Sequence, residues 1–129
     1  MTMFSMHAAS VAAQEADDSY IVGFADSRAQ PQEYVILQRS VQTEADDNEP
    51  DTYFIEINGQ ECSGYGGIRS ATLDKDKLTL VLAQDNDYAD GLAGVTITFD
   101  GADGVPPDLK HYLTLVFLGT DCKFSTVPS

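Results

Sequence analysis

The 129-residue chain contains no Trp and only seven Lys and Arg against 21 Asp and Glu, so its formal net charge is −14. Nucleic-acid binding depends on neutralising phosphates with Lys and Arg, and docking on anionic membrane surfaces also needs cationic side chains. The shortage of basic residues therefore argues against both kinds of partner. It favours attraction to a basic protein instead.

Long apolar runs are also missing. No stretch approaches the roughly 18 apolar residues that a membrane-spanning helix needs, so we expect no transmembrane segment. The N-terminal residues 1–18 include Ala-rich stretches but lack the positively charged start of a signal peptide. We therefore interpret them as mature sequence.

Cysteine and histidine are scarce, with two residues of each. Cys62 and Cys122 match no metal-binding or redox spacing, and without a secretion signal we expect reduced, buried or half-buried thiols. His7 and His111 have no His or Glu three or four residues further on. These patterns predict no metal site.

Catalytic and cofactor motifs are absent as well. Segment 85–91 (DNDYADG) fails as an EF-hand, because Asp90 stands where that loop needs Gly and Thr96 where it needs Glu. No G-x-S-x-G occurs, and the GYGG at 64–67 lacks the Lys-Ser/Thr of a phosphate-binding loop. We predict no enzymatic activity and no cofactor. The alternative is an enzyme or ligand-binding protein whose site is built from residues distant in the sequence, such as Cys62 with a histidine and an acid.

The chain does have apolar residues in strand-like alternation. The fold class predicted is α+β: a mainly antiparallel sheet of about seven strands with a C-terminal amphipathic helix packed on one face. Leu109, Leu113 and Val116 recur at helical spacing after a Pro pair. We expect one domain over residues 1–129, with strands at 4–13, 20–24, 34–39, 52–57, 68–73, 77–82 and 94–99.

Several glycines suggest local features of these strands. Gly23, inside the second strand, is typical of a bulge, and Asn58-Gly59 predicts a turn. The glycine-rich residues 60–67 favour a shaped loop over a regular strand. This loop has two interpretations: a turn that needs positive φ, or a loop that presents Tyr65 to a partner.

Negative charge is concentrated in one part of the chain. Residues 41–61 carry seven acidic and no basic residues, which is half of the net charge. The run from Glu44 to Asp51 is interpreted as a solvated loop or as a docking surface. In the second case, its carboxylates would occupy a basic groove that is built for phosphates.

Three motifs resemble the immunity protein 10 family of bacterial polymorphic-toxin systems. They are YVILQR at 34–39, DTYFIEINGQ at 51–60 and SGYGGI at 63–68, and YIVGFAD at 20–26 also fits, so the resemblance covers residues 20–82. It implies a small cytoplasmic protein that binds and neutralises a cognate toxin and catalyses no reaction. The candidate positions that it carries over are Gln38, Arg39, Tyr53, Glu56, Gln60, Tyr65, Gly66 and Gly67.

The leading hypothesis is an acidic inhibitor of a basic, nuclease-like toxin domain. Opposite net charge accelerates association, as fast neutralisation of a toxin requires. The alternative is a self-associating structural or regulatory β-rich module, which leaves a homodimer open. The expected partner-binding residues are Asp46, Asp47, Glu49, Asp51, Tyr53, Glu56, Gln60, Glu61 and Tyr65.

Overall fold

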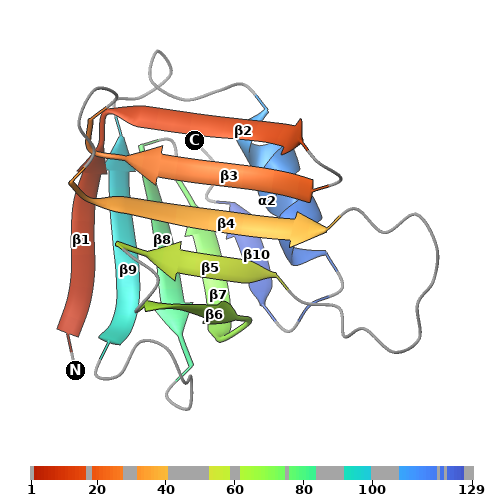
Figure 1. Cartoon of the computed structure of the whole chain (residues 1–129). Helices are drawn as coiled ribbons and strands as arrows, with labels where there is room; N and C mark the ends of the chain where they lie inside the picture. The colour runs from red at the N-terminus through yellow and green to blue at the C-terminus, as the bar shows by residue number, and fades with distance from the viewer. Residues whose placement is uncertain are drawn as a thin grey trace.

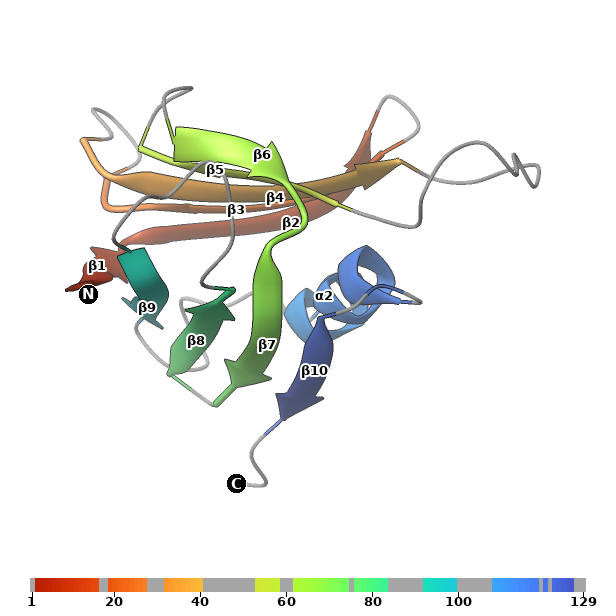
Figure 2. The same ribbon diagram turned by 90° about the horizontal axis from the view of Figure 1, so that it is seen from below.

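The structure is a computed structural model that describes residues 2–16, 19–27, 32–40, 53–58, 62–74, 76–83, 92–99, 108–118, 120 and 122–126. Within these residues the chain forms two five-stranded β-sheets and one α-helix, α2 (Leu109–Phe117). The sheets lie face to face (Figure 1). Seen from the edge in Figure 2, the second sheet and α2 lie on the same side of the first.

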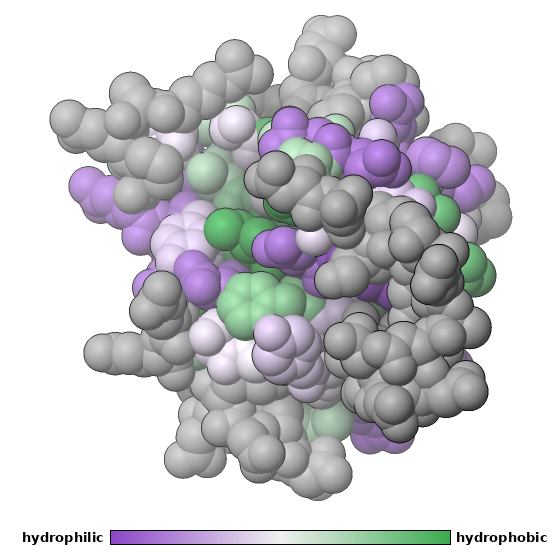
Figure 3. Space-filling model, turned by 45° about the vertical axis from the view of Figure 1, so that its right-hand side comes forward, coloured by the Kyte–Doolittle hydropathy of each residue, from purple (hydrophilic) through white to green (hydrophobic). Residues whose placement is uncertain are grey.

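The first sheet, here the antiparallel sheet, contains five strands in chain order, each antiparallel to the next. Its side chains alternate between two faces. Val22 and Leu37 are fully buried on the inner face, while Ile21 and Ile36 lie half-buried on the outer face. Figure 3 shows apolar side chains gathered on the molecular surface over this sheet. The strands are β2 (Ser10–Ala16), β3 (Ser19–Ala25), β4 (Tyr34–Ser40), β5 (Phe54–Ile57) and β6 (Ser63–Tyr65).

The second sheet, here the mixed sheet, has the order β1-β9-β8-β7-β10. Its three central strands pair antiparallel, whereas β1 pairs parallel with β9 and β10 parallel with β7. The predicted hairpin of residues 68–82 is confirmed as β7 and β8. The strands are β1 (Thr2–Ala8), β7 (Ile68–Leu73), β8 (Lys77–Leu82), β9 (Leu92–Phe99) and β10 (Lys123–Thr126).

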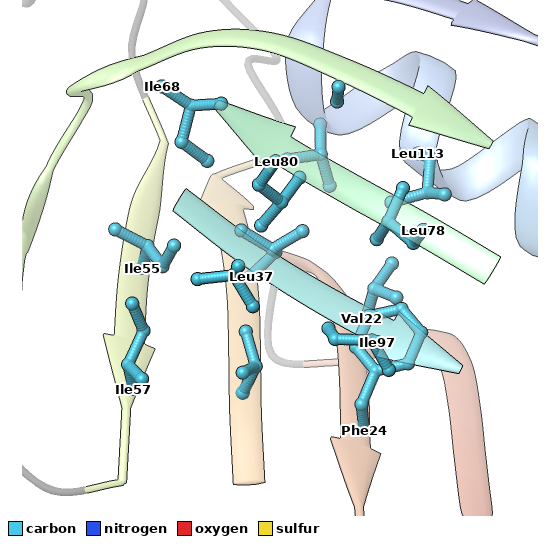
Figure 4. Packing of buried hydrophobic residues seen from close by; sticks show 14 of the residues in the cluster. Val22, Phe24, Leu37, Ile55, Ile57, Ile68, Leu78, Leu80, Ile97 and Leu113 are labelled. Atoms are coloured by element: carbon cyan, nitrogen blue, oxygen red, sulfur yellow. The ribbon is translucent and has the colours of Figure 1, made fainter. Parts of the chain in front are cut away.

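The hydrophobic core fills the space between the two sheets (Figure 4). Val22, Leu37 and Ile55 of the antiparallel sheet and Leu80 and Ile97 of the mixed sheet are 0% exposed. Burying each such side chain stabilises the fold by about 1.5–3 kcal/mol. The alternating apolar residues that predict strands are thus also the residues that hold the sheets together.

Helix α2 packs between the antiparallel sheet and β10, and more extensively against β3 than against any other strand. Leu109, Leu113 and Val116 are buried on its inner side. Phe117 meets Tyr53 edge to face, with ring centroids 5.1 Å apart. The helix therefore completes the core beside the mixed sheet.

The α+β class is confirmed, but seven strands is wrong, because the described residues form ten. The expected first strand, 4–13, is two strands in different sheets, β1 and β2, with a bend at Ala9. Met6 and Ala8 are buried on even positions and Val11 on an odd one. This change of phase marks the place where the chain crosses from one sheet to the other.

Two further strands and the place of the helix also differ from expectation. The three-residue β6 lies in the glycine-rich segment, and β10 follows the helix with only Phe124 half-buried. Neither strand carries an alternating apolar pattern. The face of the antiparallel sheet is covered mainly by the mixed sheet, and α2 covers only its β2–β4 end.

Candidate functional site

The candidate site lies at the β5–β6 end of the antiparallel sheet, on its outer face. Here β6 is the edge strand, and its Tyr65 pairs with Phe54 of β5. Tyr65 is 75% exposed, and its ring packs edge-on against Phe54 with centroids 5.5 Å apart. A large aromatic ring held in this way offers contact area at a low cost in conformational entropy.

The turn after Tyr65 is shaped by two glycines and supported by Tyr53. Gly66 and Gly67 have φ of 70° and 87°, where a side chain would be strained. The Gly66 N–H donates to the Tyr53 carbonyl at 2.8 Å. The interpretation that the glycines are needed for positive φ is confirmed. Tyr65 is exposed at the surface, and its contact with a partner stays a prediction.

Tyr53 itself is 3% exposed and lies in the core. Its hydroxyl accepts a hydrogen bond from the Ile68 N–H at 2.8 Å and lies 3.3 Å from the Ile68 carbonyl. A buried side chain offers almost no surface to a partner. The expectation that Tyr53 contacts a partner directly is therefore wrong. Tyr53 instead supports the turn from the core side.

Glu56 lies two residues further along β5 and accepts a hydrogen bond from the Tyr34 hydroxyl. This bond, followed by burial and the negative charge of Glu56, raises the pKa of Tyr34. The turn after β5 is also fixed to the start of β4, because the Asn58 side chain accepts a hydrogen bond from the Tyr34 N–H at 2.7 Å. Asn58 itself has a φ of 58°. Glu56 is therefore a fixed carboxylate on the outer face and not a freely rotating one.

Six of the residues expected at the site, five of them acidic, lie outside the described residues: Asp46, Asp47, Glu49, Asp51, Gln60 and Glu61. The residues on either side of segment 41–52, which holds the first four, are described. These are Ser40, the last residue of β4, and Tyr53, which directly precedes β5. Gln38, two residues before Ser40, pairs with Phe54, which pairs with Tyr65. The acidic segment thus starts and ends in the part of the sheet where Tyr65 lies.

Arg39, one of the positions carried over from the family resemblance, has a structural role. Its guanidinium faces α2 and donates to the carbonyls of Leu115 at 3.2 Å, Val116 at 3.3 Å and Leu118. The last turn of α2 contains no basic residue, so a cation from β4 interacts with the negative end of the helix dipole.

The residues considered for catalysis or metal binding lie on different elements. His7 on β1 places its Nδ1 2.9 Å from the Thr98 hydroxyl, and His111 lies on the exposed side of α2. Cys62 and Cys122 are free thiols, half-buried and buried respectively. Among the described residues, no group of His, Cys, Asp and Glu could hold a metal ion.

Sequence reasoning missed the outward-facing apolar residues Ile21, Ile36 and Phe54. The signal for them is present in the strands YIVGF and YVIL, which are apolar at consecutive positions. In an antiparallel sheet such a run places apolar side chains on both faces. Only the arrangement of the sheets reveals which of those faces is open.

These features define a small, acidic, two-sheet protein with an exposed aromatic edge suited to contact with another protein. The immunity protein 10 family model matches residues 5–104, more than three quarters of the chain. The chain therefore belongs to the immunity protein 10 family, which implies a cognate toxin as its partner. The match begins within β1, includes β2 to β9 and ends before α2.

No curated protein matches the chain significantly. Within the described residues, no helix has the length and apolar character needed to cross a bilayer.

Proposed function

We propose that this protein neutralises its cognate toxin by direct binding through the β5–β6 end of the antiparallel sheet and the adjoining acidic segment. The observation that carries the proposal is the 75% exposed Tyr65, held on an edge strand beside both ends of that segment. The proposed contact residues are Asp46, Asp47, Glu49, Asp51, Glu56, Gln60, Glu61 and Tyr65.

The proposed toxin is basic and nuclease-like. A nuclease binds phosphates through Lys and Arg, so an acidic protein can occupy the same groove. The net charge of −14 would also steer the encounter and raise the association rate. We place the encounter in the bacterial cytoplasm and assign no reaction to the chain, because immunity proteins generally act by binding.

The proposal is tested with the toxin domain encoded beside this gene, prepared as a catalytically inactive variant. We expect tight binding that weakens steeply between about 50 and 500 mM salt, because screening shortens the range of charge attraction. Co-expression with the active toxin should restore growth. Absence of binding, or growth arrest despite co-expression, would contradict the proposed function.

Neutralising Asp46, Asp47 and Glu49 together should mainly slow association. The matched control neutralises Asp74, Asp76 and Asp108, which lie on the β7–β8 hairpin and at the start of α2. It removes the same number of charges away from the proposed interface, so it should slow association much less than the first set does. Equal slowing by both sets would place the interface elsewhere. Light scattering at two concentrations tests the self-associating alternative, which predicts a stable homo-oligomer without the toxin.

A further inference from the structure

The outer face of the antiparallel sheet contains an open hollow of about 510 Å³. Its lining includes small residues of β2 and β3, among them Gly23. A Cβ built on Gly23 would meet no atom within 4 Å. Gly23 pairs regularly with Ala12 and Ile36, so the expected bulge is not present. The lining residues are Ser10, Ala12, Gly23, Phe24, Ala25, Tyr34 and Ile36.

This hollow is unusual for the solvent face of an antiparallel sheet, which is ordinarily polar. Ile36 forms part of its wall, and Ile21 and Phe54 lie half-buried further along the same face. The mixed sheet and α2 both cover the opposite face (Figure 2). Apolar surface on a sheet face that the described residues leave uncovered commonly marks an interaction site.

The polar side-chain groups in the hollow are too few to orient a polar small molecule. They are the hydroxyls of Ser10 and Tyr34, and the Tyr34 hydroxyl already donates to Glu56. Small-molecule sites generally add several placed polar groups to an apolar wall. The hollow therefore suits an apolar side chain of a protein partner better than a metabolite.

The charge of this chain indicates what kind of partner surface provides the apolar side chain. Residues 10–65, which include the whole antiparallel sheet, contain twelve acidic and two basic residues, whereas residues 66–129 contain nine and five. One of those two bases, Arg39, faces α2 on the inner side. Of the twelve acids, Glu15 and Glu56 lie in the strands of the sheet, and the other ten lie in the segments that connect those strands. This part of the chain is thus strongly negative, and it complements a positive surface.

We propose that the hollow at Gly23 receives an apolar side chain that projects from a basic surface of the cognate toxin. This inference rests on the proposed function and extends its interface from Tyr65 across β5 and β4 to β2. A central apolar anchor surrounded by opposite charges is the arrangement that concentrates binding energy in protein interfaces.

In the first test, the variant Gly23→Phe fills the hollow with a side chain of the protein itself. Its matched control is Val81→Phe, which adds the same ring at a 42% exposed position on the outer face of the mixed sheet. Affinity for the inactive toxin domain is measured by calorimetry, and folding by circular dichroism and thermal melting. We expect Gly23→Phe to weaken binding at least about thirtyfold, and Val81→Phe less than about threefold.

The second test compares Ala12→Lys with Ala12→Glu, two side chains of similar length at an exposed position in the hollow. Because both add bulk, a difference between them reports charge. A basic toxin surface should disfavour Lys at least about tenfold more than Glu at low salt. This pair also remains informative if Gly23→Phe does not fold.

The outcomes separate this inference from the proposed function. If the unaltered chain does not bind the toxin, both fail. If it binds and the folded Gly23→Phe variant binds equally well, the hollow is not part of the interface, while the proposed function stands. Loss of a homodimer in Gly23→Phe with toxin affinity unchanged would assign the hollow to a second copy of this chain and overturn the inference. Equal effects of Lys and Glu at position 12 would overturn its basic-surface part.

Discussion

The hydroxyl of Tyr53 lies 2.8 Å from the backbone nitrogen and 3.3 Å from the carbonyl oxygen of Ile68, so one side chain pairs with both polar groups of a buried residue. Ile68 begins β7 of the mixed sheet, and Tyr53 directly precedes β5 of the antiparallel sheet. The bond thus joins the two sheets at the point where the chain crosses between them. It also lies directly behind the turn that presents Tyr65.

Removing this hydroxyl with Tyr53→Phe should lower the free energy of unfolding by about 1–3 kcal/mol, because the buried groups of Ile68 lose their partner. Urea unfolding followed by circular dichroism measures the change. The control is Tyr65→Phe at the surface, which should stay within about 0.5 kcal/mol of the unaltered chain. Equal stabilities of the two variants would show that the Tyr53 hydroxyl contributes nothing.

Two strand glycines should respond oppositely to Ala. A Cβ at Gly94 of β9 would lie 2.4 Å from the carbonyl oxygen of Leu80 on the adjacent strand. The backbone must shift to accommodate it, so Gly94→Ala should destabilise the fold by about 1–3 kcal/mol. Gly23→Ala meets open space and should leave stability unchanged or raise it by up to about 1 kcal/mol. Thermal melting of both variants provides the measurement, and a neutral Gly94→Ala contradicts the close approach.

Arg39 of β4 should stabilise the fold through its hydrogen bonds to the last turn of α2. Arg39→Met keeps the aliphatic stem but removes the donors to the carbonyls of Leu115 and Val116. We expect a loss of about 1.5–3 kcal/mol in urea unfolding, and Arg39→Lys should lose less because it retains the charge. If Arg39→Met is as stable as the unaltered chain, the interaction with the end of the helix contributes nothing measurable, and equal losses in Met and Lys would remove only the contribution of charge.

Tyr65 should contribute to binding and not to folding. Tyr65→Ala removes a 75% exposed ring, so the melting temperature should hardly change. Affinity for the toxin domain should fall at least about tenfold, as for a central aromatic contact. The matched control is Leu118→Ala, which truncates a 61% exposed side chain after α2 and should bind normally. Unchanged affinity in Tyr65→Ala would remove Tyr65 from the proposed interface.

Stability should fall in alkaline solution through Cys122. Burial raises the pKa of this thiol from 9.0 to about 12. In the unfolded chain the thiol ionises near its ordinary pKa, so above about pH 9 the unfolded state binds fewer protons than the folded state. The contribution of Cys122 is therefore fully present below that pH and is lost as the pH rises toward 12.

Urea unfolding at several values from about pH 8 to pH 10.5 tests this dependence. Tyr and Lys residues also titrate there, so the comparison is with Cys122→Ala, whose stability should decline less with pH. The half-buried Cys62 has a pKa raised by burial as well, and Cys62→Ala provides the second reference. Identical pH slopes for the unaltered chain and Cys122→Ala would contradict the prediction.

Most strands are predictable from the sequence because burial on one face of a sheet imposes a period of two. Leu78, Leu80 and Leu82 indicate β8 directly, and all three are buried. The exposed Tyr65 is anticipated by the glycines that follow it. In contrast, β10 is not predictable from its own residues, since its stability comes from parallel pairing with β7, whose paired residues lie 53 positions earlier in the chain.

The candidate site is predictable only in part for the same reason. Tyr53 and Tyr65 are both candidate positions from the family resemblance, yet one is buried and the other exposed. The difference depends on Ile68 and on Phe117, which lies 64 residues after Tyr53. A local pattern assigns a residue to one of two faces but does not say what covers each face.

The sequence by itself determined the negative charge, the membership in the immunity protein family, the strand-forming segments and the turn that needs positive φ. These properties depend on composition and on residues close together in the chain. Only the tertiary structure decided that β1 and β2 belong to different sheets, that Arg39 faces α2, and that a hollow lies open at Gly23. Those features arise from pairing and packing between distant segments, because strand alternation specifies the face of each side chain but not its neighbours.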